Sequence, residues 1–289
     1  MKQQSIILIG GPTASGKSAF AMQLAQQKNG TIINTDAMQI YAGLPLLTAQ
    51  PDPDDRAKIP HMLYEVTDPS EASSAGKWLT LAQAAIADVL AEGRTPILVG
   101  GTGLYFDALR GGLAEIPSIP ENVRVQVEAL YNDWGEEKFR SELAKKDKES
   151  ALRIARNDRQ RLIRAYEVTL YTKRPLSDWQ KTGGAKQNFA DAEIHLLLPP
   201  RDQLYAACDK RFLSMIEQGA IEEVKNLVAR HLSPALPAMK ILGVREITSY
   251  LRGETKLDEA ISKAQQMTRN YAKRQMTWFR NRWKTHLPG

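Results

Sequence analysis

Short apolar runs alternate with helix-like segments through the first hundred residues. The runs at residues 5–10, 31–34 and 96–100 (SIILIG, TIIN and PILVG) have the length and composition of buried strands, and residues 17–27 and 76–91 between them have helical spacing. Such alternation is typical of a parallel sheet with helices on its faces. We therefore predict an α/β core.

The pattern changes at Ile116. Helical spacing with many Lys, Arg and Glu side chains continues to about Lys186, so we expect residues 116–190 to form an inserted all-helical lobe. A further buried strand is predicted in residues 192–200, where prolines end an apolar run, and four helical segments follow. The core is thus expected to comprise residues 1–115 and 191–289. TGGAKQ, from Thr182, is expected to be a mobile loop.

Composition limits the class of protein. A chain of 289 residues that is 43% hydrophobic and 25% charged suits one or two globular domains. No apolar run approaches the roughly 20 residues that span a bilayer, so no membrane segment is expected. The single cysteine, Cys208, excludes an intrachain disulfide and fits the cytoplasm, and we expect it to be a packing residue. The four histidines have no metal-ligand spacing.

Charge is unevenly distributed along the chain. Residues 1–115 hold eight Lys and Arg against eleven Asp and Glu, whereas the remainder holds 31 against 22. The basic remainder indicates a polyanionic partner, and a solvated charged surface is the alternative.

GPTASGKS, residues 11–18, matches the G-x-x-x-x-G-K-[ST] phosphate loop and lies between a predicted strand and a predicted helix. In this context, backbone N–H groups and the helix N-terminus bind phosphate oxygens, Lys17 adds a positive charge, and the Ser18 hydroxyl can ligate Mg²⁺. The strand PILVG does not end in the acid typical of ATPases. It runs instead to Thr102, which can offer its hydroxyl to a phosphate or cap the next helix.

Asp36 follows the second strand and is expected at the carboxyl edge of the sheet, facing the same crevice as Lys17. A carboxylate in that position can accept a proton from an incoming nucleophile. Gln39, from the same turn, can read a base or a ribose. The structural alternative is that Asp36 caps its own turn.

Two basic helices are expected in the second half. Gln160, Arg161 and Arg164 share one helical turn, although Arg164 can also simply pair with Glu167. Residues 268–284 hold six basic residues and no acid. Helical geometry puts Arg269, Lys273, Arg280 and Lys284 in one stripe, beside a packing face of Met276, Phe279 and Trp283. Positive charge beside aromatic rings is typical of a nucleic-acid contact, and membrane-surface binding is a weaker alternative.

Taken together, these motifs resemble those of the bacterial tRNA dimethylallyltransferases, also called tRNA isopentenyltransferases. GPTASGKS, DAMQIY with TAQP, VGGTGLYF, NDRQRLIRAYEV, GAIEEV, ILGVRE and YAKRQMTWFR occur in that family's order over nearly the whole chain. The resemblance implies a P-loop-type core, Mg²⁺ as cofactor and transfer of a dimethylallyl group from dimethylallyl diphosphate to N6 of the adenine 3′-adjacent to the anticodon. It implies a cytoplasmic enzyme with the tRNA anticodon stem-loop as partner, and we expect a monomer.

The family's residue roles carry over to matching positions. Asp36 is implied as general base, Lys17 and Thr102 as catalytic residues toward the diphosphate, and Ser18 as the metal ligand. Diphosphate binding is implied for Gly11, Thr13, Ala14, Ser15, Gly16, Lys17 and Ser18. Contact with tRNA is implied for Asp36, Ala37, Met38, Gln39, Thr102, Arg124, Gln160, Arg161, Arg164, Lys240, Arg245, Arg274, Gln275, Trp278 and Arg280. Ala37 and Leu47 depart from the residues usual in the family, Ser and Gly.

Three other functions remain open on the residues alone. A small-molecule kinase uses the same loop and would bind ATP, but it has no need of the basic C-terminal helix. An RNA-binding nucleotide switch leaves Asp36 without a role. An isopentenyltransferase acting on free adenine nucleotides has little use for the two basic segments.

Overall fold

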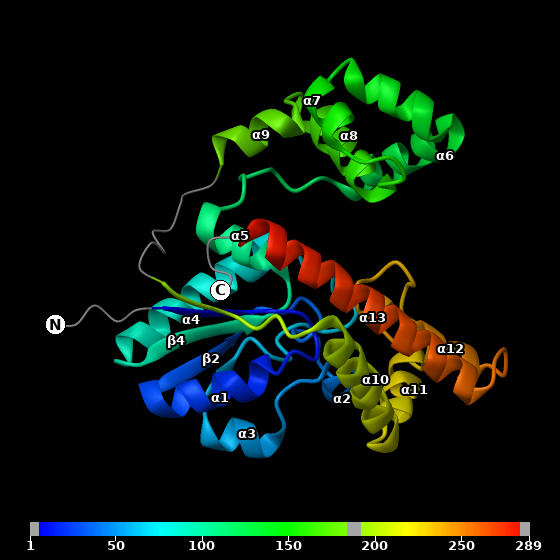
Figure 1. Cartoon of the computed structure of the whole chain (residues 1–289). Helices are drawn as coiled ribbons and strands as arrows, with labels where there is room; N and C mark the ends of the chain where they lie inside the picture. The colour runs from blue at the N-terminus through cyan, green and yellow to red at the C-terminus, as the bar shows by residue number, and fades with distance from the viewer. Residues whose placement is uncertain (1–5, 184–191, 284–289) are drawn as a thin grey trace. The chain divides into compact units, whose positions relative to one another are not determined.

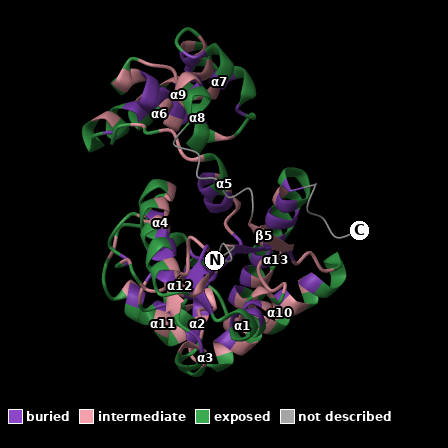
Figure 2. Cartoon of the chain, turned by 90° about the vertical axis from the view of Figure 1, so that its left-hand side faces the viewer, coloured by how far each residue is buried: buried purple, intermediate pink, exposed green. Residues whose placement is uncertain are grey.

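The computed structural model describes residues 6–183 and 192–283 as two compact units. One unit is built from the described residues up to Ala108 and from residue 192 onward, and the other runs from Leu109 to Gly183. Each unit encloses its own buried core (Figure 2). Most of TGGAKQ, and Lys284 of the predicted basic stripe, lie outside the described residues.

A five-stranded parallel sheet forms the centre of the first unit, in the order β3-β2-β4-β1-β5 (Figure 1). Its strands are β1 (Ile7–Gly10), β2 (Gly30–Asn34), β3 (His61–Met62), β4 (Thr95–Gly100) and β5 (Glu193–Leu196). The predictions of a parallel α/β core and of a helical insertion are both confirmed. The two-residue edge strand β3 was not predicted.

Helices of the first unit cover the sheet and extend beyond its carboxyl edge. They are α1 (Lys17–Lys28), α2 (Pro45–Thr48), α3 (Pro53–Lys58), α4 (Ala75–Ala91), α10 (Arg201–Glu217), α11 (Ala220–Val228), the 3₁₀ turn η1 (Ala238–Lys240), α12 (Val244–Leu251) and α13 (Leu257–Arg282), with α5 (Gly103–Gly111) at the junction of the units. Four α-helices follow β5 in the described residues, as predicted.

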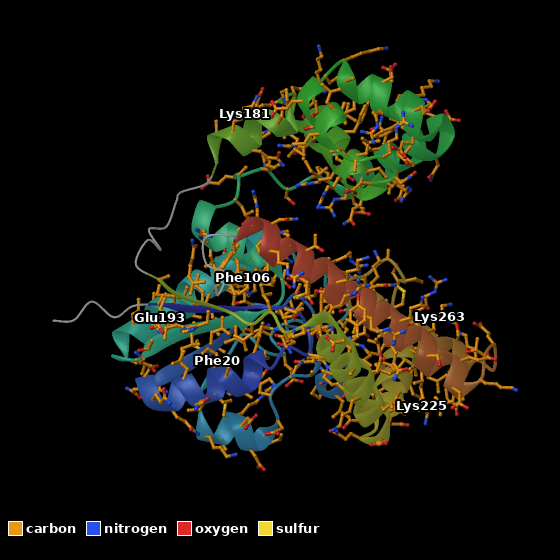
Figure 3. The ribbon with its side chains drawn as sticks, in the orientation of Figure 1. Phe20, Phe106, Lys181, Glu193, Lys225 and Lys263 are labelled. Carbon is orange, nitrogen blue, oxygen red and sulfur yellow. The ribbon has the colours of Figure 1, made fainter. Side chains whose placement is uncertain are left out.

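Side chains of successive strand residues lie on opposite faces of the sheet. Ile7 and Ile9 of β1 pack with Leu24 of α1 on one face. On the other face, Gly10 lies so close to the Phe279 ring of α13 that an added Cβ would come within 2.6 Å of the ring. Phe106 of α5, which is labelled in Figure 3, packs edge to face on Phe279 and on Trp283. The long C-terminal helix is therefore part of the sheet's core.

The second unit is entirely helical in the residues described. It contains α6 (Glu121–Ala144), α7 (Lys148–Arg153), α8 (Arg159–Thr172) and α9 (Leu176–Thr182). Phe139 of α6 and Tyr166 of α8 pack at its centre. The buried Asp147 carboxylate accepts hydrogen bonds from Ser150 and from the Ser177 amide, which joins α7 to α9. Within the described residues, every helix of the chain is too short or too polar to cross a membrane.

Candidate active site

The phosphate loop turns sharply between β1 and α1. Ala14 and Gly16 have φ of 62° and 86°, and α1 begins directly afterwards at Lys17. The Lys17 ammonium donates to the Pro12 carbonyl over 2.6 Å. Burial lowers the pKa of Lys17 to about 8, with Asp36 opposing the shift and Arg211 adding to it. The loop thus concentrates positive charge and backbone N–H groups at one point.

Arg211 of α10 is a second cation at this loop. Its guanidinium donates to the Thr13 hydroxyl, and burial lowers the pKa of Arg211. Two partly buried cations therefore lie beside one loop, and Asp36 is the one carboxylate among the groups that shift their pKa values, with the Cys208 thiol acting in the same direction. Such an arrangement favours a multiply charged anion. Sequence reasoning missed Arg211 because no motif marks it and 198 residues separate it from Thr13.

The Asp36 turn is held by Asn34, the last residue of β2. The Asn34 side chain is fully buried, accepts from the Asp36 N–H over 2.8 Å and donates to the carbonyls of Asp36 and Leu63, both over 3.0 Å. One Asp36 carboxylate oxygen accepts from the Met38 N–H over 2.9 Å. The turn-capping interpretation of Asp36 is therefore correct, and the same carboxylate also lines the cavity described next.

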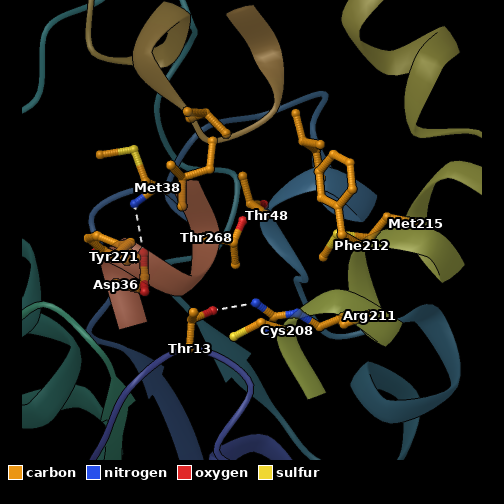
Figure 4. Close-up of a pocket in the computed structure, with 13 residues that line it drawn as sticks. Thr13, Asp36, Met38, Thr48, Cys208, Arg211, Phe212, Met215, Thr268 and Tyr271 are labelled. Carbon is orange, nitrogen blue, oxygen red and sulfur yellow. Dashed lines mark hydrogen bonds between the residues drawn. The ribbon is translucent and has the colours of Figure 1, made fainter. Parts of the chain in front are cut away.

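A cavity of about 60 Å³ lies in front of the loop (Figure 4). Its polar side carries Thr13, Asp36 and Arg211. Its apolar side is formed by Met38, Leu47, Phe212, Met215, Ile241 and Leu242. Cys208 also lines it and is a buried packing residue, as predicted. The arrangement suits a small hydrocarbon group joined to an anion, next to a carboxylate.

Thr102 connects the Asp36 turn to the end of β4. Its hydroxyl oxygen accepts from the Ala37 N–H over 2.9 Å and pairs with the Tyr271 hydroxyl. Burial and the nearby Asp36 raise the pKa of Tyr271. Gln39, which was expected to read a base, uses its amide N–H₂ to donate to the carbonyls of Thr48 and Ala49, over 2.9 and 2.7 Å.

A larger cavity, of about 830 Å³, also borders Arg211, and its lining includes Ser18, the predicted metal ligand. Ser18 is exposed at the start of α1, whereas the Ser15 hydroxyl is buried with no hydrogen-bond partner in the described residues. No three metal-ligating side chains gather anywhere in those residues. The Ser18 hydroxyl nevertheless fits Mg²⁺, because the Ser of a phosphate loop is a usual ligand of that ion, and substrate phosphates and waters supply the other oxygens.

The residues of α13 that were expected to contact tRNA are in part exposed and in part buried. Arg274 and Arg280 are exposed, and Trp278 lies against the backbone at Gly103, where an added Cβ would come within 2.3 Å of its ring. Gln275 is buried instead: its carbonyl accepts from the Thr13 N–H over 2.8 Å and its amide donates to the Gly101 carbonyl over 2.9 Å. Gln275 therefore fastens α13 to the phosphate loop.

Other expected RNA-contact residues lie outside the cavity. Lys240 and Arg245 are exposed around η1 and α12. In the helical unit, Arg124, Gln160 and Arg161 are exposed. Arg164 is partly buried and pairs with Glu167 over 3.5 Å, the alternative that its spacing had suggested. Arg269 of the predicted stripe is also occupied, because it pairs with Asp209.

Comparison with known proteins gives consistent matches. The IPP transferase family model matches residues 39–282, and the isopentenyl transferase model matches residues 4–59. A tRNA dimethylallyltransferase of Phenylobacterium zucineum is 53% identical over 95% of this chain and 89% of its own length. The tRNA isopentenylpyrophosphate transferase of Bacillus halodurans matches in structure with a TM-score of 0.66 and 34% identity, over 97% of this chain and 88% of that one. A eukaryotic dimethylallyltransferase acting on tRNA matches with a TM-score of 0.83 and 28% identity, over 96% of this chain and 70% of that one.

Proposed function

The chain belongs to the IPP transferase family, and from this premise we propose that it transfers a dimethylallyl group from dimethylallyl diphosphate to tRNA. The acceptor is N6 of the adenine 3′-adjacent to the anticodon, and diphosphate is released. One observation carries the proposal: the Asp36 carboxylate lines the same small cavity as Thr13 and Arg211 of the phosphate loop site, with an apolar wall opposite.

The diphosphate binds at the loop. Lys17 and Arg211 neutralise it, and backbone N–H groups of the loop donate to its oxygens. The loop residues proposed for this are Gly11, Thr13, Ala14, Ser15, Gly16, Lys17 and Ser18. Ser18 holds Mg²⁺, which supplies further neutralisation of the phosphate oxygens when it is bound.

The transfer is a substitution at the allylic carbon. The adenine N6 amine forms the new C–N bond as the C–O bond to the diphosphate breaks, and the amine proton passes to the Asp36 carboxylate. Negative charge grows on the leaving diphosphate, where Lys17 and Arg211 stabilise it. The Thr102 hydroxyl accepts a hydrogen bond from the Ala37 N–H and so holds Ala37 in place beside the adenine base.

RNA contact is proposed for a set of basic and polar residues, all exposed except the partly buried Arg164, and for the Asp36 turn from Asp36 to Gln39. The basic and polar residues are Arg124, Gln160, Arg161, Arg164, Lys240, Arg245, Arg274 and Arg280, with Trp278 as an aromatic contact. For Gln275 we propose a positioning role, because both ends of its amide are bonded within the protein. The enzyme is proposed to act as a monomer in the cytoplasm, on the anticodon stem-loop.

Transfer assays separate this function from its alternatives. Purified protein is incubated with Mg²⁺, radiolabelled dimethylallyl diphosphate and either bulk tRNA or AMP. Label in tRNA alone is the expected result. Label in AMP alone would indicate the activity on free nucleotides. In parallel incubations, phosphate transfer from added ATP would indicate a kinase, and tRNA binding without any transfer would indicate an RNA-binding protein.

A further inference from the structure

One wall of the catalytic cavity is a single helical turn. The four-residue α2 (Pro45–Thr48) contributes Leu47 and Thr48 to the cavity lining. A helix of this length is not stable alone, because forming its first turn fixes several backbone angles for one hydrogen bond. Its N-terminal N–H groups and C-terminal carbonyls also need partners from elsewhere.

Glu223 of α11 supplies the partners at the N-terminal end. One carboxylate oxygen accepts from the Leu46 N–H over 2.8 Å, and the other accepts from the Leu47 N–H over 2.9 Å. At the other end of the turn, Gln39 donates to the carbonyls of Thr48 and Ala49. Side chains from outside α2 therefore hold both of its ends.

A glycine makes room for Leu47 of α2, and a second glycine lies near Leu46. At Gly243, with φ of 92°, an added Cβ would come within 3.0 Å of the Leu47 side chain and of the Phe212 ring. At Gly219, with φ of 110°, it would lie 4.0 Å from Leu46. These glycines belong to ILGVRE and GAIEEV, the latter of which also contains Glu223. Both motifs therefore contribute to the surface against which α2 packs.

We propose that Glu223 is a positioning residue that holds α2 as the wall of the donor's hydrocarbon pocket and so determines how tightly, and how selectively, the dimethylallyl group is bound. The inference rests on the proposed function. Glu223 lies behind α2 and is not in the cavity lining, so it acts through Leu47 and Thr48. A firmly held wall favours the five-carbon group and excludes longer prenyl chains.

Glu223→Gln is the direct test, because a glutamine has one acceptor oxygen and turns its amide N–H₂ toward the second backbone N–H. Glu222→Gln is the matched control, since Glu222 is the preceding residue, is exposed and pairs only with Lys225, over 3.2 Å, in the described contacts. Glu223→Gln should raise the KM for dimethylallyl diphosphate at least about tenfold, the change expected for loss of one charge-assisted hydrogen bond. It should also reduce the preference for dimethylallyl over geranyl diphosphate. The KM for tRNA and the Kd for inorganic diphosphate should stay unchanged.

Each alternative outcome has a defined meaning. A folded Glu223→Gln protein with the wild-type KM for the donor would overturn the inference. An equal loss of inorganic diphosphate binding would overturn it too, since Glu223 would then support the whole site and not the hydrocarbon pocket. If neither the wild type nor Glu222→Gln transferred label to tRNA, the proposed function itself would fail.

Discussion

Replacing Gln275 by methionine tests how α13 supports the phosphate loop. Methionine keeps the length and approximate volume of the buried side chain but cannot pair with the Thr13 N–H or with the Gly101 carbonyl. Both backbone groups would be left without their present partner, in a place where Gln275 is only 6% exposed to water.

The size of the effect follows from these two groups. A buried backbone group that loses its partner costs about 1 to 3 kcal/mol, so the variant should lose about 2 to 6 kcal/mol of unfolding free energy. The Thr13 hydroxyl also accepts a hydrogen bond from the Arg211 guanidinium, so the affinity for the diphosphate donor should fall as well. Binding of tRNA should change little, because Gln275 is not at the surface.

Urea unfolding of the sheet-containing unit and hydrogen exchange at the Thr13 amide measure this change. Gln266→Met is the control, since Gln266 lies on the same helix with its side chain exposed. The reasoning is refuted if Gln275→Met stays within about 0.5 kcal/mol of the wild type, the range of an ordinary surface substitution, with unchanged exchange at Thr13.

Three further predictions concern the chemistry and the RNA. Asp36→Asn should lower kcat by about 10² to 10⁴ while the Kd for tRNA is preserved, and parallel loss of binding would contradict the general-base role. The pKa of Lys17 is lowered to about 8 in the free protein, so its positive charge is present below pH 8 and is lost above it. The KM for the donor should therefore rise from pH 8 upward, by up to about tenfold per pH unit. A KM that stays constant to high pH would contradict this. Arg280→Ala should reduce the salt dependence of tRNA binding by about one, whereas Arg269→Ala, which breaks an internal pair with Asp209, should leave it unchanged.

Local patterns were enough to predict the sheet and the placement of Asp36 where its charge acts on Lys17. Each residue follows a strand that the apolar runs marked, and parallel strands bring their carboxyl ends to one edge. The predicted packing face of the C-terminal helix is likewise confirmed, since Met276, Phe279 and Trp283 are all buried. These features depend on the periodicity of single segments and on the general rule for parallel strands, both of which can be applied to a sequence directly.

Contacts between distant segments were not predictable in the same way. Helical geometry grouped Arg269 with the other basic residues of the stripe, but the acid that neutralises Arg269 lies on α10. Gln275 was expected to contact RNA, and nothing in its own segment indicates the buried N–H and carbonyl that it pairs with. The turn α2 was missed because its partners, Glu223 and Gln39, come from other parts of the chain.

The hydrogen bond from the Thr13 amide to Gln275 spans 262 residues, and this spacing matters while the protein is being made. The loop is synthesised 262 residues before the Gln275 amide that completes its hydrogen bonding. A nascent chain can therefore pair its first strands well before its phosphate loop has the partner of the Thr13 amide. The phosphate loop therefore cannot reach its final hydrogen bonding until α13 has been synthesised and has packed on the sheet.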